Sequence, residues 1–313
     1  MDILSQLLGE LRVESSIYCR FALGAGCGLE YPSGPMAAFH LVTAGRCWLV
    51  LGDERHPLAA GDFVVLPRGD RHWIQSSPSA RVEPVETAAA RARQGRARVG
   101  ADDGEPEAEF ICGALRFGAS REHPLLSALP PIVRVHGEDD ASGGASGRPL
   151  PWLATHVRAV IDEACAGAPG AETIMARLSE VLFVHAVRHQ LAELPAGAPG
   201  WLGALRDGPL AKAIGLIHRR PEHAWTVAAL GREVGLSRSQ FAERFAAVVG
   251  QPPLAYLAAW RMYLSRALLR DGVLRVGEVA RRVGYGSEAA FSTAFKRAAG
   301  VGPREYRRGT QAA

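Results

Sequence analysis

The spacing of the hydrophobic residues changes along the chain. Residues 17–75 carry short apolar runs, such as 37–42 and 63–66, and glycine-containing turns separate these runs. Short apolar runs between turn signals are typical of antiparallel strands. Residues 109–117 have the same character. We therefore predict that the first part of the chain folds as a small antiparallel β-barrel.

Helical spacing replaces the short runs in the rest of the chain. In residues 152–192 the apolar positions recur three and four residues apart, which is the spacing of one face of an α-helix. Residues 205–308 keep this spacing, and glycines interrupt it where helices would end. The pattern predicts an α+β two-domain protein, in which a β-barrel with a helical segment precedes an all-α domain.

Two segments contain few large apolar residues. Residues 76–109 are rich in small, polar and charged residues, and we predict a loose insertion there. Residues 137–151 are rich in Gly, Ser and Asp and predict a flexible linker. The chain then divides into a barrel domain at 1–136, this linker, a helical linker or dimerisation segment at 152–195, and a helical domain at 205–308.

Charge is distributed unevenly between these regions. The chain has 313 residues and a formal net charge of +4. Residues 201–313 contain 18 Lys and Arg against 8 Asp and Glu, whereas residues 1–200 contain 18 against 24. A basic region attached to an acidic remainder favours contact with a polyanion such as a nucleic acid. The alternative is a solvated surface that is basic without such a partner.

Other features of the sequence bear on where the protein works. No apolar run approaches the ~18–20 residues that span a bilayer, and the first residues lack the basic start and apolar stretch of a signal peptide. The five cysteines form no CxxC pair, which argues against a disulfide framework. We expect a cytoplasmic protein with no membrane contact and no cofactor.

The last third of the chain contains an internal repeat with an offset of 50 residues. Five positions recur with identical spacing: Phe241, Phe245, Gly250, Pro253 and Tyr256 correspond to Phe291, Phe295, Gly300, Pro303 and Tyr306. Matched spacing at this many positions indicates two copies of one helical unit.

Each copy has the local signals of a helix-turn-helix. In the first copy Thr226 can cap a helix, and Gly235 follows its last turn, where a left-handed residue commonly ends a helix. Ser237 and Gln240 then have the spacing of a capping box, which starts a second helix at once. The second helix of such a unit enters the major groove of DNA, where Arg and Gln can pair with base edges.

The exposed faces of the two second helices are the predicted DNA contacts. In the first copy these residues are Arg238, Ser239, Gln240, Ala242, Glu243 and Arg244. In the second copy they are Glu288, Ala289, Ser292, Thr293 and Lys296. The second set is poorer in base-reading groups, so we expect it to contact phosphate and to tolerate sequence changes. Residues 253–270 predict one long helix that fixes the distance between the two units.

The motifs of this region are those of a known family. Residues 210–308 resemble the AraC/XylS family of regulators in the segments 234–241, 260–262 and 291–296. The resemblance implies a DNA-binding domain of seven helices, with recognition helices at about 238–248 and 288–298.

A second resemblance covers the barrel. Residues 61–72 follow the spacing Gly, five residues, Pro, one residue, Gly, two residues, His. Together with 39–48 and 110–117, this motif resembles the cupin-type sensor domain found ahead of many AraC-type regulators. The resemblance implies a barrel over about 15–135 with His72 pointing into it.

The chain departs from metal-binding cupins in the first cupin motif. The two histidine positions of that motif fall near Tyr31 and Ser33, and the glutamate position also lacks a ligand. Strand parity places His40 on the inward face together with His72. Three protein ligands are usual for a catalytic metal, and Cys112 is the candidate third ligand.

Three interpretations of the two histidines remain open at this stage. They can form a structural, hydrogen-bonded pair inside the barrel. They can belong to an effector site made of His40, Trp48 and His72. They can hold a metal together with Cys112.

The sequence as a whole predicts a transcription regulator that binds double-stranded DNA under the control of an unidentified small-molecule effector. We expect a homodimer formed through the barrel or the helices of 152–192, although these helices could equally pack within one chain. One alternative is a cupin metalloenzyme, an isomerase or dioxygenase, with a DNA-binding appendage. Another is a constitutive DNA-binding protein with a degenerate barrel.

Overall fold

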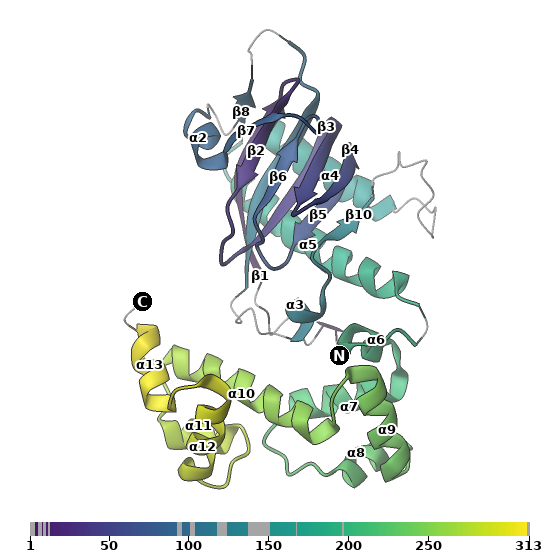
Figure 1. The fold of residues 1–313 in the computed structure, drawn as a ribbon, viewed down its shortest axis with the longest axis vertical. Coiled ribbons are helices and arrows are strands. Elements are labelled where there is room, and N and C mark those ends of the chain that lie inside the picture. Colours follow the sequence, from purple (N-terminus) through teal and green to yellow (C-terminus); the bar gives the residue numbers. More distant parts are fainter. Residues whose placement is uncertain are drawn as a thin grey trace. The chain divides into compact units, whose positions relative to one another are not determined.

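The structure is a computed structural model, and its described residues form two compact units (Figure 1). The first unit contains the described part of 11–121 and 129–193, and the second that of 1–10, 122–128 and 194–313. A β domain and an all-α domain result, which confirms the predicted α+β two-domain fold class. The described residues are 4, 5, 8, 11, 13–92, 96–100, 104–117, 124–136, 151–166, 168–195 and 197–311.

The strands described in the first unit form a sheet that curves into a half-barrel (Figure 1). They are β1 (Val13–Leu23), β2 (Cys27–Tyr31), β3 (Ala37–Leu51), β4 (Glu54–Ala59), β5 (Phe63–Leu66), β6 (His72–Gln75), β7 (Arg81–Pro84), β8 (Arg96–Val99), β9 (Ala108–Phe117) and β10 (Val133–Val135). Their order is β7-β2-β6-β3-β9-β1-β8, with β4 and β5 paired to β3 and β10 paired to β5. Two of the strand pairs, β1 with β8 and β2 with β7, are parallel, so the predicted antiparallel arrangement holds only for the remaining pairs.

Strand β3 belongs to both halves of the barrel. Its first part pairs with β5 and β9, and its second part pairs with β4 and β6. The change occurs near Gly45, whose φ is 71°. A Cβ at this position would lie 1.9 Å from the carbonyl oxygen of Glu107. The bend of β3 therefore requires glycine, because a side chain has no room where the two backbones approach.

The prediction of a loose insertion at 76–109 is wrong for much of the described part of this segment. Strand β7 is followed by helix α2 (Val85–Ala90), and β8 adds to the edge of the sheet beside β1. Ala88, Ala97 and Val99 are buried in the barrel core. Composition misled the prediction because alanine and valine can pack closely without the large side chains that normally mark a core.

Two helices after the barrel belong to the same unit. The predicted linker at 137–151 lies outside the described residues up to 150, and helix α4 (Pro151–Ala166) begins at 151. Helix α5 (Ala171–Glu193) contacts α4, β1 and β10. Phe183 of α5 is fully buried, with its ring centroid 5.4 Å from that of Phe117. Packing within one chain therefore accounts for one face of α5, and dimerisation through this segment stays a prediction.

The second unit consists of helices. Its two helix-turn-helix pairs are α8–α9 and α11–α12, and the long helix α10 joins them (Figure 1). The bounds are α3 (Pro124–Ala128), α6 (Trp201–Arg206), α7 (Gly208–Arg219), α8 (Val227–Glu233), α9 (Arg238–Val249), α10 (Pro253–Asp271), α11 (Val276–Arg282), α12 (Glu288–Ala299) and α13 (Pro303–Gln311). No helix in the described part of the chain is long and apolar enough to cross a membrane.

The repeated phenylalanines are the centres of two equivalent cores. Phe241 and Phe245 are fully buried, as are Phe291 and Phe295. The ring centroids are 5.5 Å apart in the first pair and 5.6 Å apart in the second. Burial of a phenylalanine stabilises a fold by about 1.5–3 kcal/mol, so each recognition helix is held to its own unit mainly by this pair.

Candidate DNA interface and candidate effector pocket

The turn of the first helix-turn-helix is built as its sequence predicts. The Thr226 hydroxyl accepts a hydrogen bond from the Ala229 amide at 3.0 Å and caps α8. Gly235 is left-handed, with φ of 72°. Ser237 accepts from the Gln240 amide at 3.3 Å, and the Ser237 amide donates to Gln240 Oε1 at 3.2 Å. The reciprocal bonds satisfy two amides at the start of α9 and fix its direction.

The structure gives the predicted contacts of α9 different roles. Arg238, Ser239 and Glu243 are exposed on the helix. Gln240 uses its side-chain oxygen in the capping box, so only its amide nitrogen remains for another partner. Arg244 donates to Asp207 Oδ2, with its Nη2 at 2.6 Å. Ala242, the sixth predicted contact, is half-buried.

The second recognition helix has a similar start. The Ser287 hydroxyl accepts from the Ala290 amide at 3.2 Å. Glu288 accepts from Arg304 of α13 at 2.9 Å, and the Thr293 hydroxyl donates to the Ala289 carbonyl at 3.1 Å. The remaining predicted contacts of this helix are exposed or half-buried: Ala289, Ser292 and Lys296.

The sequence did not predict two residues outside the recognition helices that form ion pairs with them. Asp207 caps α7 by accepting from the Leu210 amide, and it also pairs with Arg244. In the second copy a different ion pair, between Arg304 of α13 and Glu288, lies at the start of α12. A capping signal before Pro209 could have pointed to Asp207, but its pairing with α9 depends on tertiary contacts.

The two histidines of the barrel form a direct pair. His40 on β3 and His72 on β6 are each 1% exposed, and their Nε2 atoms are 2.8 Å apart. His72 Nδ1 lies 2.7 Å from the carbonyl oxygen of Asp70. Because a carbonyl only accepts, His72 must carry its proton on Nδ1, and its Nε2 then accepts from His40. His40 Nδ1 is consequently a bare acceptor, and it has no partner among the described residues.

Both imidazoles are neutral at neutral pH. Burial lowers the pKa of His72 from 6.5 to about 4. Burial and the neighbouring His72 lower the pKa of His40 well below its usual range. The pair therefore offers hydrogen bonds but no positive charge.

Tyr31 completes the cluster and was not among the predicted site residues. Its ring stacks on His72 with centroids 4.7 Å apart and an interplanar angle of 5°, and it meets His40 edge-on. Burial, followed by the nearby Cys112 thiol, raises the pKa of the Tyr31 phenol well above its usual range. The available signal was the position of Tyr31, which falls where the first cupin motif has a histidine.

The described residues of the cluster do not supply three grouped metal ligands. Burial raises the pKa of the Cys112 thiol to about 12. The Nε2 atoms of His40 and His72 are already engaged with each other. In the part of the chain that the structure describes, no three His, Cys, Asp or Glu residues are grouped to hold a metal ion.

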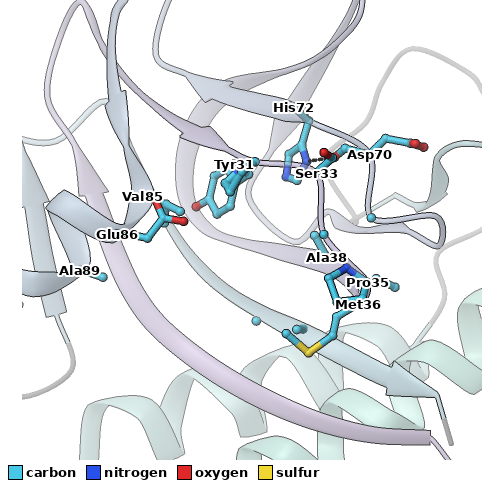
Figure 2. A pocket seen from close by; sticks show the side chains of 16 residues that line it. Tyr31, Ser33, Pro35, Met36, Ala38, Asp70, His72, Val85, Glu86 and Ala89 are labelled. Carbon is cyan, nitrogen blue, oxygen red and sulfur yellow. Dashed lines mark hydrogen bonds between the residues drawn. The ribbon is translucent and has the colours of Figure 1, made fainter. Parts of the chain in front are cut away.

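A pocket of about 320 Å³ opens beside this cluster (Figure 2). Tyr31 and His72 lie at one end, Pro35 and Met36 at the other, and helix α2 runs along one side. Of the predicted effector residues, only His72 lines the pocket. His40 lies behind it in the buried cluster, and Trp48 is half-buried elsewhere, in the part of β3 that pairs with β4 and β6.

The neutral histidines make barrel stability depend on pH. His72 takes up a proton near pH 6.5 when unfolded but only near pH 4 when folded. Below pH 6.5 the unfolded chain binds more protons, so stability falls as the pH drops towards 4, by about 3 kcal/mol from His72 at the lower end. We expect urea unfolding to show this loss in the free energy of unfolding between pH 6.5 and 4. In His72→Gln the number of protons taken up on unfolding, which is the slope of that free energy against pH, should be smaller by about one. An unchanged slope in H72Q would contradict the assignment.

Family comparisons cover both units. The family described as Cupin matches residues 2–192, and the family described as Helix-turn-helix domain matches residues 230–309. A protein of Streptomyces lividans described as an AraC-like transcription regulator is 35% identical over 311 residues, which cover 98% of each chain. The transcriptional regulator AlkR of Acinetobacter baylyi is 29% identical over 98% of this chain and 99% of that protein.

A solved structure is also similar to part of this chain. The DNA-binding domain of the transcriptional factor AdpA, in complex with a target DNA, is 31% identical, with a TM-score of 0.32 over 33% of this chain and 94% of that chain. The full-length relatives are transcription regulators rather than enzymes. The chain belongs to the AraC family of DNA-binding transcription regulators, and it combines an N-terminal cupin domain with a C-terminal helix-turn-helix domain.

Proposed function

We propose that a small molecule bound in the pocket of the barrel controls DNA binding by the helix-turn-helix domain. The observation that carries this proposal is the pocket of about 320 Å³ between α2 and the buried Tyr31–His72 stack. This volume is at the lower end of the range for small-molecule sites. A ligand that prefers one conformation of the protein shifts the population towards it and so changes DNA affinity.

We further propose that the regulator acts as a homodimer on repeated half-sites. Each chain carries two recognition helices joined by the rigid α10, which suits successive major grooves about 34 Å apart. A second chain would double the number of base and phosphate contacts. Sedimentation with and without operator DNA measures the oligomeric state.

The test of DNA binding is a footprint of the full chain on the DNA upstream of its own gene at two salt concentrations. We expect protection of about two helical turns per chain, weakening steeply with salt because bound phosphates release counterions. The sensing step is tested by repeating the footprint with candidate ligands. Ala89→Phe should fill the pocket. If this variant and the unchanged chain give the same footprint without ligand and with each candidate ligand tested, control by the barrel is contradicted.

Arg238 and Arg244 are expected to behave differently on this DNA. Arg238 is exposed at the start of α9, so Arg238→Ala should lose a base contact, weaken operator binding by about 1–3 kcal/mol and relax the sequence preference. Arg244→Ala should mainly remove the ion pair with Asp207, which contributes about 0–1 kcal/mol to stability. Binding to a library of operator variants measures both. If R244A relaxes the sequence preference and R238A leaves operator affinity and preference unchanged, then Arg244 and not Arg238 makes the base contact.

A further inference from the structure

Among the described residues, acidic side chains line the barrel pocket. Asp70 and Glu86 are among the described lining residues, and none of these is Lys or Arg. His72 is the remaining basic group, and burial lowers its pKa to about 4. The described residues that line the pocket therefore offer no positive charge to a carboxylate or phosphate ligand.

Glu86 is the carboxylate placed to meet a ligand. It lies in the first turn of α2 and points towards Tyr31, whereas the Asp70 carboxylate points away from this end of the pocket (Figure 2). The neighbouring Glu83 is paired with Arg91 at 2.5 Å. Glu86 forms no ion pair with any residue that the structure describes.

The rest of the wall suits an apolar body. Pro35, Met36, Val85 and Ala89 face the pocket together with the ring of Tyr31. Aromatic rings attract cations, and the methionine thioether adapts to flat ligands. The volume of about 320 Å³ admits a body of one or two rings.

We propose that the pocket binds a compact organic cation, with its protonated amine at Glu86 and its apolar body between Tyr31 and Met36. The proposal deepens the proposed function, on which it rests for its regulatory meaning. The preference for a cation follows from the pocket itself. The experiment can therefore contradict the ligand class without contradicting the proposed regulation, and the reverse.

The experiment is calorimetric titration of the full chain with three ligands that share an indole body. Tryptamine carries an ammonium group, tryptophol a hydroxyl and indoleacetate a carboxylate. We expect tryptamine to bind roughly tenfold more tightly than tryptophol, and indoleacetate to show no saturable binding. Equal affinities for tryptamine and tryptophol, stronger binding of indoleacetate, or no saturable binding of tryptamine at millimolar concentration would overturn the proposal.

Two variants test whether the preference for tryptamine over tryptophol arises in this pocket. Glu86→Gln removes the charge from an exposed position and should bring the affinities for tryptamine and tryptophol to within about twofold of each other. Ala89→Phe should fill the pocket and abolish binding of both, with circular dichroism confirming that the variant is folded. A tenfold preference that persists in E86Q would refute the role of Glu86. If tryptamine binds as expected but leaves the DNA footprint unchanged, the ligand class stands and the sensing function fails.

Discussion

Replacing Phe291 with alanine is expected to shorten the DNA footprint to the part contacted by the first helix-turn-helix. Phe291 is fully buried, and its ring lies 5.6 Å from the rings of both Tyr285 and Phe295. Truncating a buried phenylalanine costs about 3–5 kcal/mol because it removes apolar contacts and leaves a cavity. Such a loss exceeds what a small helical unit can absorb, so α12 should no longer be held in position. Footprinting and hydrogen exchange of α11 and α12 measure the effect.

The internal repeat supplies the matched control. Phe241→Ala removes the equivalent side chain of the first unit, and it should erase the other half of the footprint. Phe291→Leu keeps most of the apolar volume and should cost less than about 1.5 kcal/mol, leaving the footprint at full length. If F291A and F241A both abolish binding completely, the two units do not bind their grooves independently.

Local signals were sufficient for much of the DNA-binding domain. The cap at Thr226, the left-handed Gly235 and the capping box at Ser237 all act within a few residues of the chain, so the sequence carries them directly. The repeat then placed α12 by analogy with α9. These elements are confirmed by the structure.

Roles that depend on distant residues could not be derived in the same way. Arg244 looked free for DNA, but its partner Asp207 lies 37 positions earlier in the chain. Gln240 carries both a base-reading amide and a capping oxygen, and the cap uses the oxygen. Propensity and spacing describe what a side chain can do, whereas tertiary contacts select among these possibilities.

The barrel shows the same limit in its candidate site. The cupin spacing predicted that His72 points into the barrel, and strand parity predicted the same for His40; the two side chains do meet there. The same spacing places Tyr31 at a histidine position of the first cupin motif, but the prediction did not include this tyrosine in the site and named Trp48 instead. The half-buried Trp48 lies away from the pocket, and α2, which forms one wall, falls in a segment whose composition predicted no structure.

Gly45→Ala is expected to unfold the barrel. The new Cβ would lie 1.9 Å from the Glu107 carbonyl oxygen and 3.0 Å from Ala108 Cα, and both are backbone atoms of a paired segment. The backbone at Gly45 is also left-handed, with φ of 71°, which alone costs an L-residue about 1–2 kcal/mol. Relief of the clash requires separation of β3 from β9 at the bend, so we expect a total loss of more than about 4 kcal/mol. Urea unfolding combined with hydrogen exchange of β3 and β9 measures it.

Gly52→Ala separates the two causes. Gly52 has φ of 59°, but nothing lies within 4 Å of a Cβ built on it. This variant should therefore lose only the conformational part, about 1–2 kcal/mol, and keep the barrel folded. Since the helix-turn-helix domain has its own core, exchange in α11 and α12 should be the same in both variants. Equal losses in G45A and G52A would show that the backbone angle, and not the approach of residues 107 and 108, is what requires glycine at the bend.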